Sequence, residues 1–204
     1  MKTIVIIIVL VGLGVSVKAQ SNLTIEASQN ITNFMFENSF GEKVDGYSPS
    51  YSGGYALGYS YNLENGLYFP FKAGMRKAGA TYIYDNSNYS WSLQYLDLRL
   101  GLGYDYSFGK FGTHLSVTGY YGYMLKGIQT LNNQDFDIRN AGDINKNDFG
   151  IFFSPGVSFT ANDYISVYLD VNYMLGLGNL ESNTEQKSNN RMYGATLGLA
   201  FSIK

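Results

Sequence analysis

The stretch YLDLRLGLGYDYSF, residues 95–108, alternates between two kinds of side chain without interruption. One set is bulky and apolar or aromatic, and the other is small or charged: Leu96, Leu98, Leu100, Leu102, Tyr104 and Tyr106 against Asp97, Arg99, Gly101, Gly103 and Asp105. In a helix these leucines would lie around the whole circumference, whereas in a strand they share one face. The period of two therefore predicts a β-strand, whose apolar face meets either a protein core or lipid.

The same alternation recurs along the chain. It predicts strands over 54–63, 67–76, 115–125, 151–159, 165–175 and 193–203, and a weaker strand with mixed faces over 25–36. No helical period persists after residue 20, and no linker divides the chain, so we expect one domain of eight strands. A membrane-spanning strand needs about 9–11 residues, which fits eight strands in a chain of this length.

The first nineteen residues have the pattern of a cleavable signal peptide. Lys2 supplies the positive charge, an apolar run covers residues 4–15, and Val17 and Ala19 are small residues before the cleavage point. This run is shorter than the roughly 20 residues that a spanning helix needs. We therefore predict a signal peptide over 1–19, export from the cytoplasm, and a single domain over 20–204.

Composition excludes several classes of protein. The chain contains no cysteine, which excludes a lipoprotein anchor, a thiolate metal site, a cysteine nucleophile and disulfides. A net charge of −2 argues against a nucleic-acid-binding surface. Charged residues make up 15% of the chain and aromatic residues 16%, and the charged share is well below the ~25% of ordinary soluble domains.

The connections between the predicted strands favour lipid over a protein core. Short turns at 64–66, 109–110 and 161–163 alternate strictly with long polar segments at 37–50, 84–90, 127–147 and 178–190. This alternation places every long loop at one end, as in outer-membrane barrels with short periplasmic turns. We therefore predict an all-β fold, an eight-stranded antiparallel up-and-down transmembrane β-barrel. A secreted soluble β-sandwich or barrel is the alternative.

Several glycine-rich and aromatic stretches carry a family resemblance: AGMRKAG at 73–79, YLDLRL at 95–100, GYYGYMLKG at 119–127, NDFGIFFSPGVSF at 147–159, GLGNL at 176–180 and NRMYGATLGLAF at 190–201. With these the chain resembles the porin-family outer-membrane β-barrel domain of the Bacteroidetes, similar in architecture to OmpA/OmpX-type barrels. The resemblance implies a monomer in the Gram-negative cell outer membrane, without cofactor or catalytic motif. Its partners would be outer-membrane lipid, periplasmic chaperones, the barrel assembly machinery during insertion, and a possible protein partner.

Charged residues recur on the predicted inner face of the barrel: Lys72, Arg76, Asp97, Arg99, Asp105, His114, Lys126 and Asp170. They form either a gated path for small ions or an ion-paired plug. Eight strands leave room only for side chains, and an unpaired buried charge is too costly to persist. We therefore favour the plug and expect little or no conductance.

His114 and Ser116 are the one pair that suggests catalysis. Lipid A deacylase barrels of the outer membrane use a histidine and a serine two residues apart on the lipid-facing side of a strand. Here Leu115 and Val117 occupy that side, so we expect His114 to point inward and predict no catalytic residues. A lipid-modifying enzyme that uses His114 and Ser116 is the less favoured alternative.

The segment Asp143-x-Asn145-x-Asn147 resembles the start of a calcium-binding loop. The glycine of that motif is replaced by Asp148, and the twelfth position is Ser154 instead of glutamate. A solvated surface loop is the better interpretation, and we predict no metal site.

The long loops at 37–50, 127–147 and 178–190 are the segments free to carry recognition. In the 127–147 loop, Leu131, Phe136, Ile138 and Arg139 suggest a segment that contacts a partner. The equally favoured alternative is that the three apolar side chains, Leu131, Phe136 and Ile138, fold back over the barrel mouth as a lid. The predicted function is a non-enzymatic barrel with a structural, adhesive or partner-binding role, and a narrow pore for ions or small solutes is the alternative.

Overall fold

The computed structural model describes residues 20–142, 144–182 and 185–203, which form one ten-stranded sheet. The predicted signal peptide and Asp143 lie outside the described residues. The strands are β1 (Gln20–Glu37), β2 (Lys43–Val44), β3 (Ser48–Asn62), β4 (Leu67–Tyr84), β5 (Ser87–Phe108), β6 (Phe111–Leu131), β7 (Gln134–Asp137), β8 (Asn147–Asn162), β9 (Ile165–Gly176) and β10 (Lys187–Ile203). Within the described ranges, no helix is long and apolar enough to cross a membrane.

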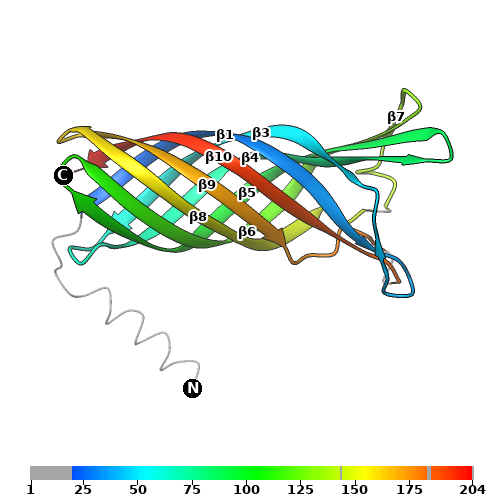
Figure 1. Cartoon of the computed structure of the whole chain (residues 1–204), viewed down its shortest axis with the longest axis horizontal. Coiled ribbons are helices and arrows are strands. Elements are labelled where there is room, and N and C mark those ends of the chain that lie inside the picture. The colour runs from blue at the N-terminus through cyan, green and yellow to red at the C-terminus, as the bar shows by residue number, and fades with distance from the viewer. Residues whose placement is uncertain (1–19, 143, 183–184, 204) are drawn as a thin grey trace, which may run out of the picture.

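The sheet closes into a barrel (Figure 1). Its ring runs β1, β3, β4, β5, β6, β8, β9 and β10, each antiparallel to the next, and β10 pairs with β1 from Ser21↔Ile203 to Glu37↔Lys187. The short strands β2 and β7 lie outside the ring, on β1 and β6. The predicted eight-stranded up-and-down barrel is therefore confirmed.

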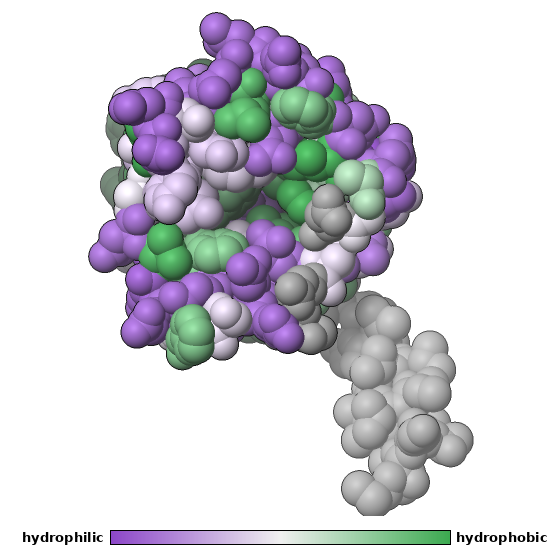
Figure 2. All heavy atoms as spheres, turned by 90° about the vertical axis from the view of Figure 1, so that its right-hand side faces the viewer, coloured by the Kyte–Doolittle hydropathy of each residue, from purple (hydrophilic) through white to green (hydrophobic). Residues whose placement is uncertain are grey.

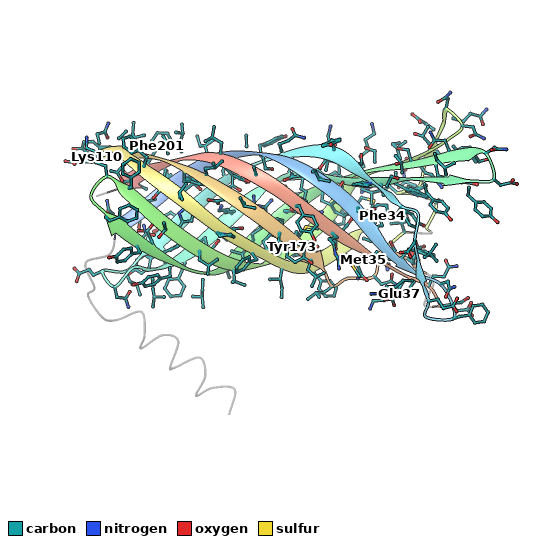
Figure 3. All side chains as sticks on the ribbon, in the orientation of Figure 1. Phe34, Met35, Glu37, Lys110, Tyr173 and Phe201 are labelled. Atoms are coloured by element: carbon teal, nitrogen blue, oxygen red, sulfur yellow. The ribbon has the colours of Figure 1, made fainter. Side chains whose placement is uncertain are left out.

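The barrel is inside out relative to a soluble protein. Large apolar side chains of all eight ring strands are exposed on the outer surface, where Figure 3 shows side chains standing away from the ribbon. The buried set instead contains charged and amide side chains such as Arg76, Asp97 and Asn190. An apolar exterior and a polar interior are what a lipid solvent demands.

Two of the predicted long loops are hairpins, which corrects the sequence analysis. β4 and β5 continue past the barrel and join through Asp85-Asn86, whose φ values are 45° and 58°. β6 likewise continues to Leu131, turns through Asn132-Asn133 at φ 48° and 69°, and returns as β7. Asn and Asp tolerate positive φ and form such two-residue turns, so a polar stretch was mistaken for a loop.

The continued strands form a projecting hairpin sheet, defined as residues 81–84 of β4, 87–93 of β5, 127–131 of β6 and all of β7. It extends beyond the ring at the right of Figure 1. Its two tips are joined, because Asn132 N donates to Asn88 O at 3.1 Å and Asn88 N donates to Asn132 Oδ1 at 2.9 Å. The sheet is thus a rigid extension of the barrel wall.

Along β5 the polarity of the two faces inverts at Gln94. Towards the short turns, the outer face carries Leu96, Leu98 and further exposed apolar side chains, which with those of the other ring strands form the apolar band around the barrel. Towards the tip, the outer face carries Ser92, Ser90 and Asn88. The inner face changes in the opposite sense, from Asp97 to Leu93, Trp91 and Tyr89. This inversion marks the level at which lipid gives way to water.

A β-bulge corrects the predicted position of Lys126. Gln94 pairs with Lys126 and Tyr95 with Met124, so Leu125 is an extra residue on β6. One extra residue shifts the alternation by one position. Lys126 is consequently exposed on the outer face and does not belong to the interior.

Candidate functional site

A buried arginine lies inside the barrel, towards the end with the long loops. The side chain of Arg76, on β4, is 1% exposed; its Nε donates to Asp97 Oδ2 at 2.8 Å and its Nη2 to Asp148 Oδ2 at 3.0 Å. Its guanidinium also lies 4.7 Å from the ring centre of Tyr95 and 5.1 Å from that of Tyr120. One cation therefore neutralises carboxylates that come from β5 and β8.

Asp148 is an interior residue that was not predicted from the sequence. The structure places it on the inner face at the start of β8, where its Oδ2 also accepts hydrogen bonds from Tyr120 Oη at 3.0 Å and Asn190 Nδ2 at 2.7 Å. The sequence did contain a signal for it: Asp148 is separated by even numbers of residues from Gly150 and Phe152, so all three lie on the same, inner face of β8. Asp148 was not predicted because the strand was expected to begin at residue 151, whereas it begins at Asn147.

A second group of charges lies next to the first, on the side of the short turns. Glu26 on β1 pairs with Lys72, accepts a hydrogen bond from Tyr168 Oη at 3.0 Å, and lies 3.5 Å from Arg99 Nη1. Arg99 Nη2 is 3.5 Å from Asp97 Oδ2, which joins the two groups into one network. Glu26 was not predicted as an interior residue, because both faces of the first strand are mixed in polarity.

His114 and Asp170 form a separate pair. His114 Nε2 lies 2.7 Å from Asp170 Oδ1, and Gly156 lies beside both, so that a Cβ there would be 2.4 Å from the imidazole nitrogen. Ser116 is also on the inner face, while Leu115 is exposed on the outside. The histidine and serine of the enzyme alternative therefore face the barrel interior.

Of the eight predicted interior charges, the structure joins Lys72, Arg76, Asp97 and Arg99 in the network and pairs His114 with Asp170. Asp105 lies nearer the short turns and accepts a hydrogen bond from Ser107 Oγ at 2.8 Å. Lys126 lies outside. Among the described residues, no group of three or more histidine, aspartate or glutamate side chains is placed to hold a metal ion.

A cavity of about 1020 Å³ fills the end of the barrel with the short turns. Its lining is rich in hydroxyl and amide side chains, including Asn22, Thr24, Tyr68, Ser116 and Tyr168. Along β5 the inner residues run from Asp105 at this cavity, through Arg99 and Asp97 in the network, to Tyr95 and Leu93. The cavity is thus followed by charge and then by apolar side chains.

These apolar side chains form a lid at the loop end of the barrel, defined here as Phe34, Ala78, Ala80, Leu93, Tyr95, Met124, Ile138 and Leu180. Ile138 is 6% exposed within this lid. Phe136, in contrast, is 47% exposed on β7, Leu131 is half-buried, and Arg139 contacts Tyr123 on the outside. The four residues proposed for recognition are therefore divided: Ile138 covers the mouth and the other three do not.

The charge network and the lid follow one another along the barrel interior. We therefore predict that the folded protein forms no large, stable, ohmic channel in a planar bilayer. The reason is that an ion would have to cross both paired buried charges and a packed apolar layer. The control is to show that the protein sample is folded. A folded barrel migrates faster on a gel when it is unheated than when it is boiled. Long-lived channels of large conductance from such a sample would contradict this arrangement.

The mouth continues into an aromatic platform, defined as Tyr82, Tyr84, Tyr89 and Trp91 on the inner face of the hairpin sheet together with Tyr47, which packs on them from the connection between β2 and β3. Tyr47 stacks on Tyr82 with ring centres 4.8 Å apart, and Tyr89 stacks on Trp91 at 6.0 Å. Burial, with the neighbouring Tyr82 and Glu181, raises the pKa of Tyr47 to about 12, so its hydroxyl stays protonated at neutral pH. Figure 2 views this end, where a hydrophilic rim surrounds a hollow containing hydrophobic residues.

A closed eight-stranded barrel with an apolar exterior, a charged interior and long extensions at one end defines a small transmembrane barrel of the outer membrane. The chain matches the family model described as "Outer membrane protein beta-barrel domain" over residues 5–202, and it belongs to that family. No curated protein matches the sequence.

Solved structures share this fold at low sequence identity. The attachment invasion locus protein Ail of Yersinia pestis, in complex with the heparin analogue sucrose octasulfate, superposes with a TM-score of 0.51 at 12% identity, covering 91% of this chain and 99% of that one. Neisserial surface protein A gives 0.51 at 14%, covering 89% and 97%. OprG from Pseudomonas aeruginosa gives 0.51 at 14%, covering 91% and 97%. At such identities the likeness establishes the fold.

Proposed function

We propose that this protein is a non-enzymatic surface receptor or adhesin that binds its partner on the aromatic platform of the hairpin sheet. The observation that carries the proposal is the inversion of polarity at Gln94. On the tip side of Gln94, the inner face of the sheet is aromatic although this part of the sheet lies outside the membrane. Solubility alone would favour polar residues on both faces of a sheet that has left the membrane.

The platform has the physical properties of a binding surface. Tyrosine and tryptophan offer large contact areas with few rotatable bonds. Here stacking and the joined hairpin tips hold the rings in place, so little side-chain entropy is lost on binding. Tyr84, at the outer end of the platform, remains 63% exposed.

Charge around the platform indicates the chemistry of the partner. Asp85 lies in the turn of the β4–β5 hairpin, and Asp135 lies next to the turn of the β6–β7 hairpin. Carboxylates there would repel a sulfated polysaccharide, so we propose a neutral glycan or a neutral to basic protein surface. The complex of Ail with a heparin analogue supports recognition of extracellular molecules by such a barrel, although this chain would require a ligand of different charge.

The two alternatives from the sequence have weaker support. A pore is disfavoured by the lid and charge network, which lie in series across the barrel. A lipid-modifying enzyme is disfavoured because His114 and Ser116 face the interior, away from lipid acyl chains.

Replacing Tyr84 and Tyr89 together by serine is expected to weaken adhesion of expressing cells to immobilised neutral glycans and matrix proteins at least tenfold. Two aromatic anchors at about 1 kcal/mol or more each account for such a loss. Ile83→Ser is the matched control, because Ile83 is 73% exposed on the opposite face of the same hairpin. Equal adhesion of the double variant and wild type, with both folded in the outer membrane, would refute the platform as the binding surface.

A further inference from the structure

A cationic row crosses the outer wall of the barrel. Lys77 on β4 pairs in register with Gln94 on β5, and Gln94 pairs with Lys126 on β6. Residues directly opposite one another on antiparallel strands share a face, and both lysines are exposed. Neighbouring strands lie about 4.8 Å apart, which places the two lysines roughly 10 Å apart at their backbones.

The row lies at the boundary of the apolar band. On the short-turn side of Gln94 the outer face of β5 carries Leu96 and Leu98, both exposed, whereas on the tip side it carries Ser92. β6 repeats the pattern with Tyr123 and Leu125 before Lys126. Since the long extensions of such barrels face the cell exterior, the row lies at the headgroups of the outer leaflet.

The charges of the row are not neutralised by the protein. Over residues 20–142, 144–182 and 185–203, no carboxylate lies within ion-pairing distance of Lys77 or Lys126. The interior cations Lys72, Arg76 and Arg99, in contrast, each have at least one carboxylate partner. Positive charge is therefore retained on the lipid-facing wall and cancelled inside.

Arg139 adds a third cation beside the row. Its Nε donates to Met124 O at 3.0 Å, its Nη2 lies 3.5 Å from Tyr123 Oη, and its Nη1 lies 3.3 Å from Asn140 Oδ1. The carboxylate of Asp137 contacts its backbone N and not its guanidinium. This anchoring holds the guanidinium of Arg139 at the backbone of Met124, which is two residues before Lys126 on β6.

We propose that Lys77, Gln94, Lys126 and Arg139 bind the phosphate groups of a phosphorylated outer-leaflet glycolipid of the lipid A type. The ammonium and guanidinium groups would pair with phosphate, and the Gln94 amide would bond a phosphate or sugar oxygen. The acyl chains would lie on Leu96, Leu98 and Leu125, which continue the row into the bilayer. Charge complementarity and this continuity with the apolar band select the lipid as the occupant.

The geometry distinguishes a lipid from free phosphate. The row is an open strip on a convex wall, where phosphate alone would keep most of its hydration, so binding depends on the acyl chains as well as the charge. This proposal concerns the lipid-facing wall and is independent of the aromatic platform on the inner face.

The test uses the folded protein in neutral detergent micelles, titrated with diphosphorylated lipid A and followed by native mass spectrometry. Lys77→Gln/Lys126→Gln is expected to weaken binding about 10–30-fold, since each basic residue near an anionic lipid surface contributes about 1 kcal/mol. Lys77→Arg/Lys126→Arg should bind as wild type does. The matched control is Lys43→Gln/Lys110→Gln, which removes the same charge from β2 and from the opposite end of the barrel, where Figure 3 labels Lys110.

Three results would overturn the proposal. The first is equal binding of lipid A by the Lys77/Lys126 and Lys43/Lys110 glutamine variants, when both migrate as folded barrels. The second is equal binding of lipid A stripped of its phosphates. The third is displacement of lipid A by a few millimolar inorganic phosphate, which would define a site for a free anion instead of a lipid.

Discussion

Replacing Arg76 by methionine is expected to destabilise the barrel by about 3–5 kcal/mol, the usual cost of removing one partner from a buried ion pair. Asp97 and Asp148, both fully buried, would lose their shortest contacts to a cation. Asp148 would retain only neutral donors, the hydroxyl of Tyr120 and the amide of Asn190, for a full negative charge. The free energy of unfolding in guanidinium, followed by the fluorescence of Trp91, the only tryptophan, measures the loss.

Arg99→Met is the matched control for Arg76. The Arg99 side chain is 14% exposed and its carboxylate contacts are 3.5 Å long, while Glu26 would retain Lys72. We therefore expect a clearly smaller loss. Adding Asp148→Asn to Arg76→Met should restore part of the stability, because Asp97 retains Arg99 and the network then holds two cations and two carboxylates. Equal losses for Arg76→Met and Arg99→Met would show that burial of the pair does not set the cost.

Gly101→Val is expected to prevent assembly of the barrel, or to destabilise it by more than the about 1–3 kcal/mol of ordinary overpacking. A Cβ at Gly101 would lie 2.0 Å from the carbonyl oxygen of Val117 and 2.6 Å from Cα of Thr118. Both are backbone atoms of the paired strand β6, so no side chain can turn away to make room. Loss of the fast-migrating band on an unheated gel reports the failure.

Gly119→Val is the matched control for Gly101→Val. Gly119 lies on β6 and pairs with Leu100, the residue next to Gly101. Gly119 faces outward, and its nearest atoms to an added Cβ are 3.9 and 4.0 Å away. A valine there should be accommodated and should add apolar surface towards lipid. Assembly of both variants to the same extent would show that the inner wall adjusts to a side chain at Gly101.

The outline of the fold could be predicted from alternation alone. The run at 95–108 establishes a two-faced strand, and strand number follows from chain length and the length of a membrane-spanning strand. The inward orientation of Arg76, Asp97 and Arg99 was recoverable for the same reason, since within an uninterrupted strand parity determines the face. The ends of the strands were not recoverable, because in water the outer face becomes polar and the strand then resembles a loop.

The errors in the site have local causes. Lys126 was assigned to the interior because the extra residue Leu125 leaves no trace in the polarity pattern. Glu26 was missed because polar residues occur on both faces of β1, where Gln29 is exposed and Asn30 is buried. The partners of the buried charges lie on strands distant in sequence, so Arg76 and Asp148 could be brought together only by the closed ring.

The seam between β1 and β10 also determines when the fold can be completed. Ser21 and Ile203 are partners from nearly opposite ends of the chain, so the seam forms only after the last strand has been delivered. Until then the hydrogen-bonding edges of the first and latest strands remain open, and open edges promote association between chains. Closing so long a loop is entropically slow. The seam therefore makes the C-terminal strand the final, committing step of folding, and its delay is the interval in which the exported chain needs protection.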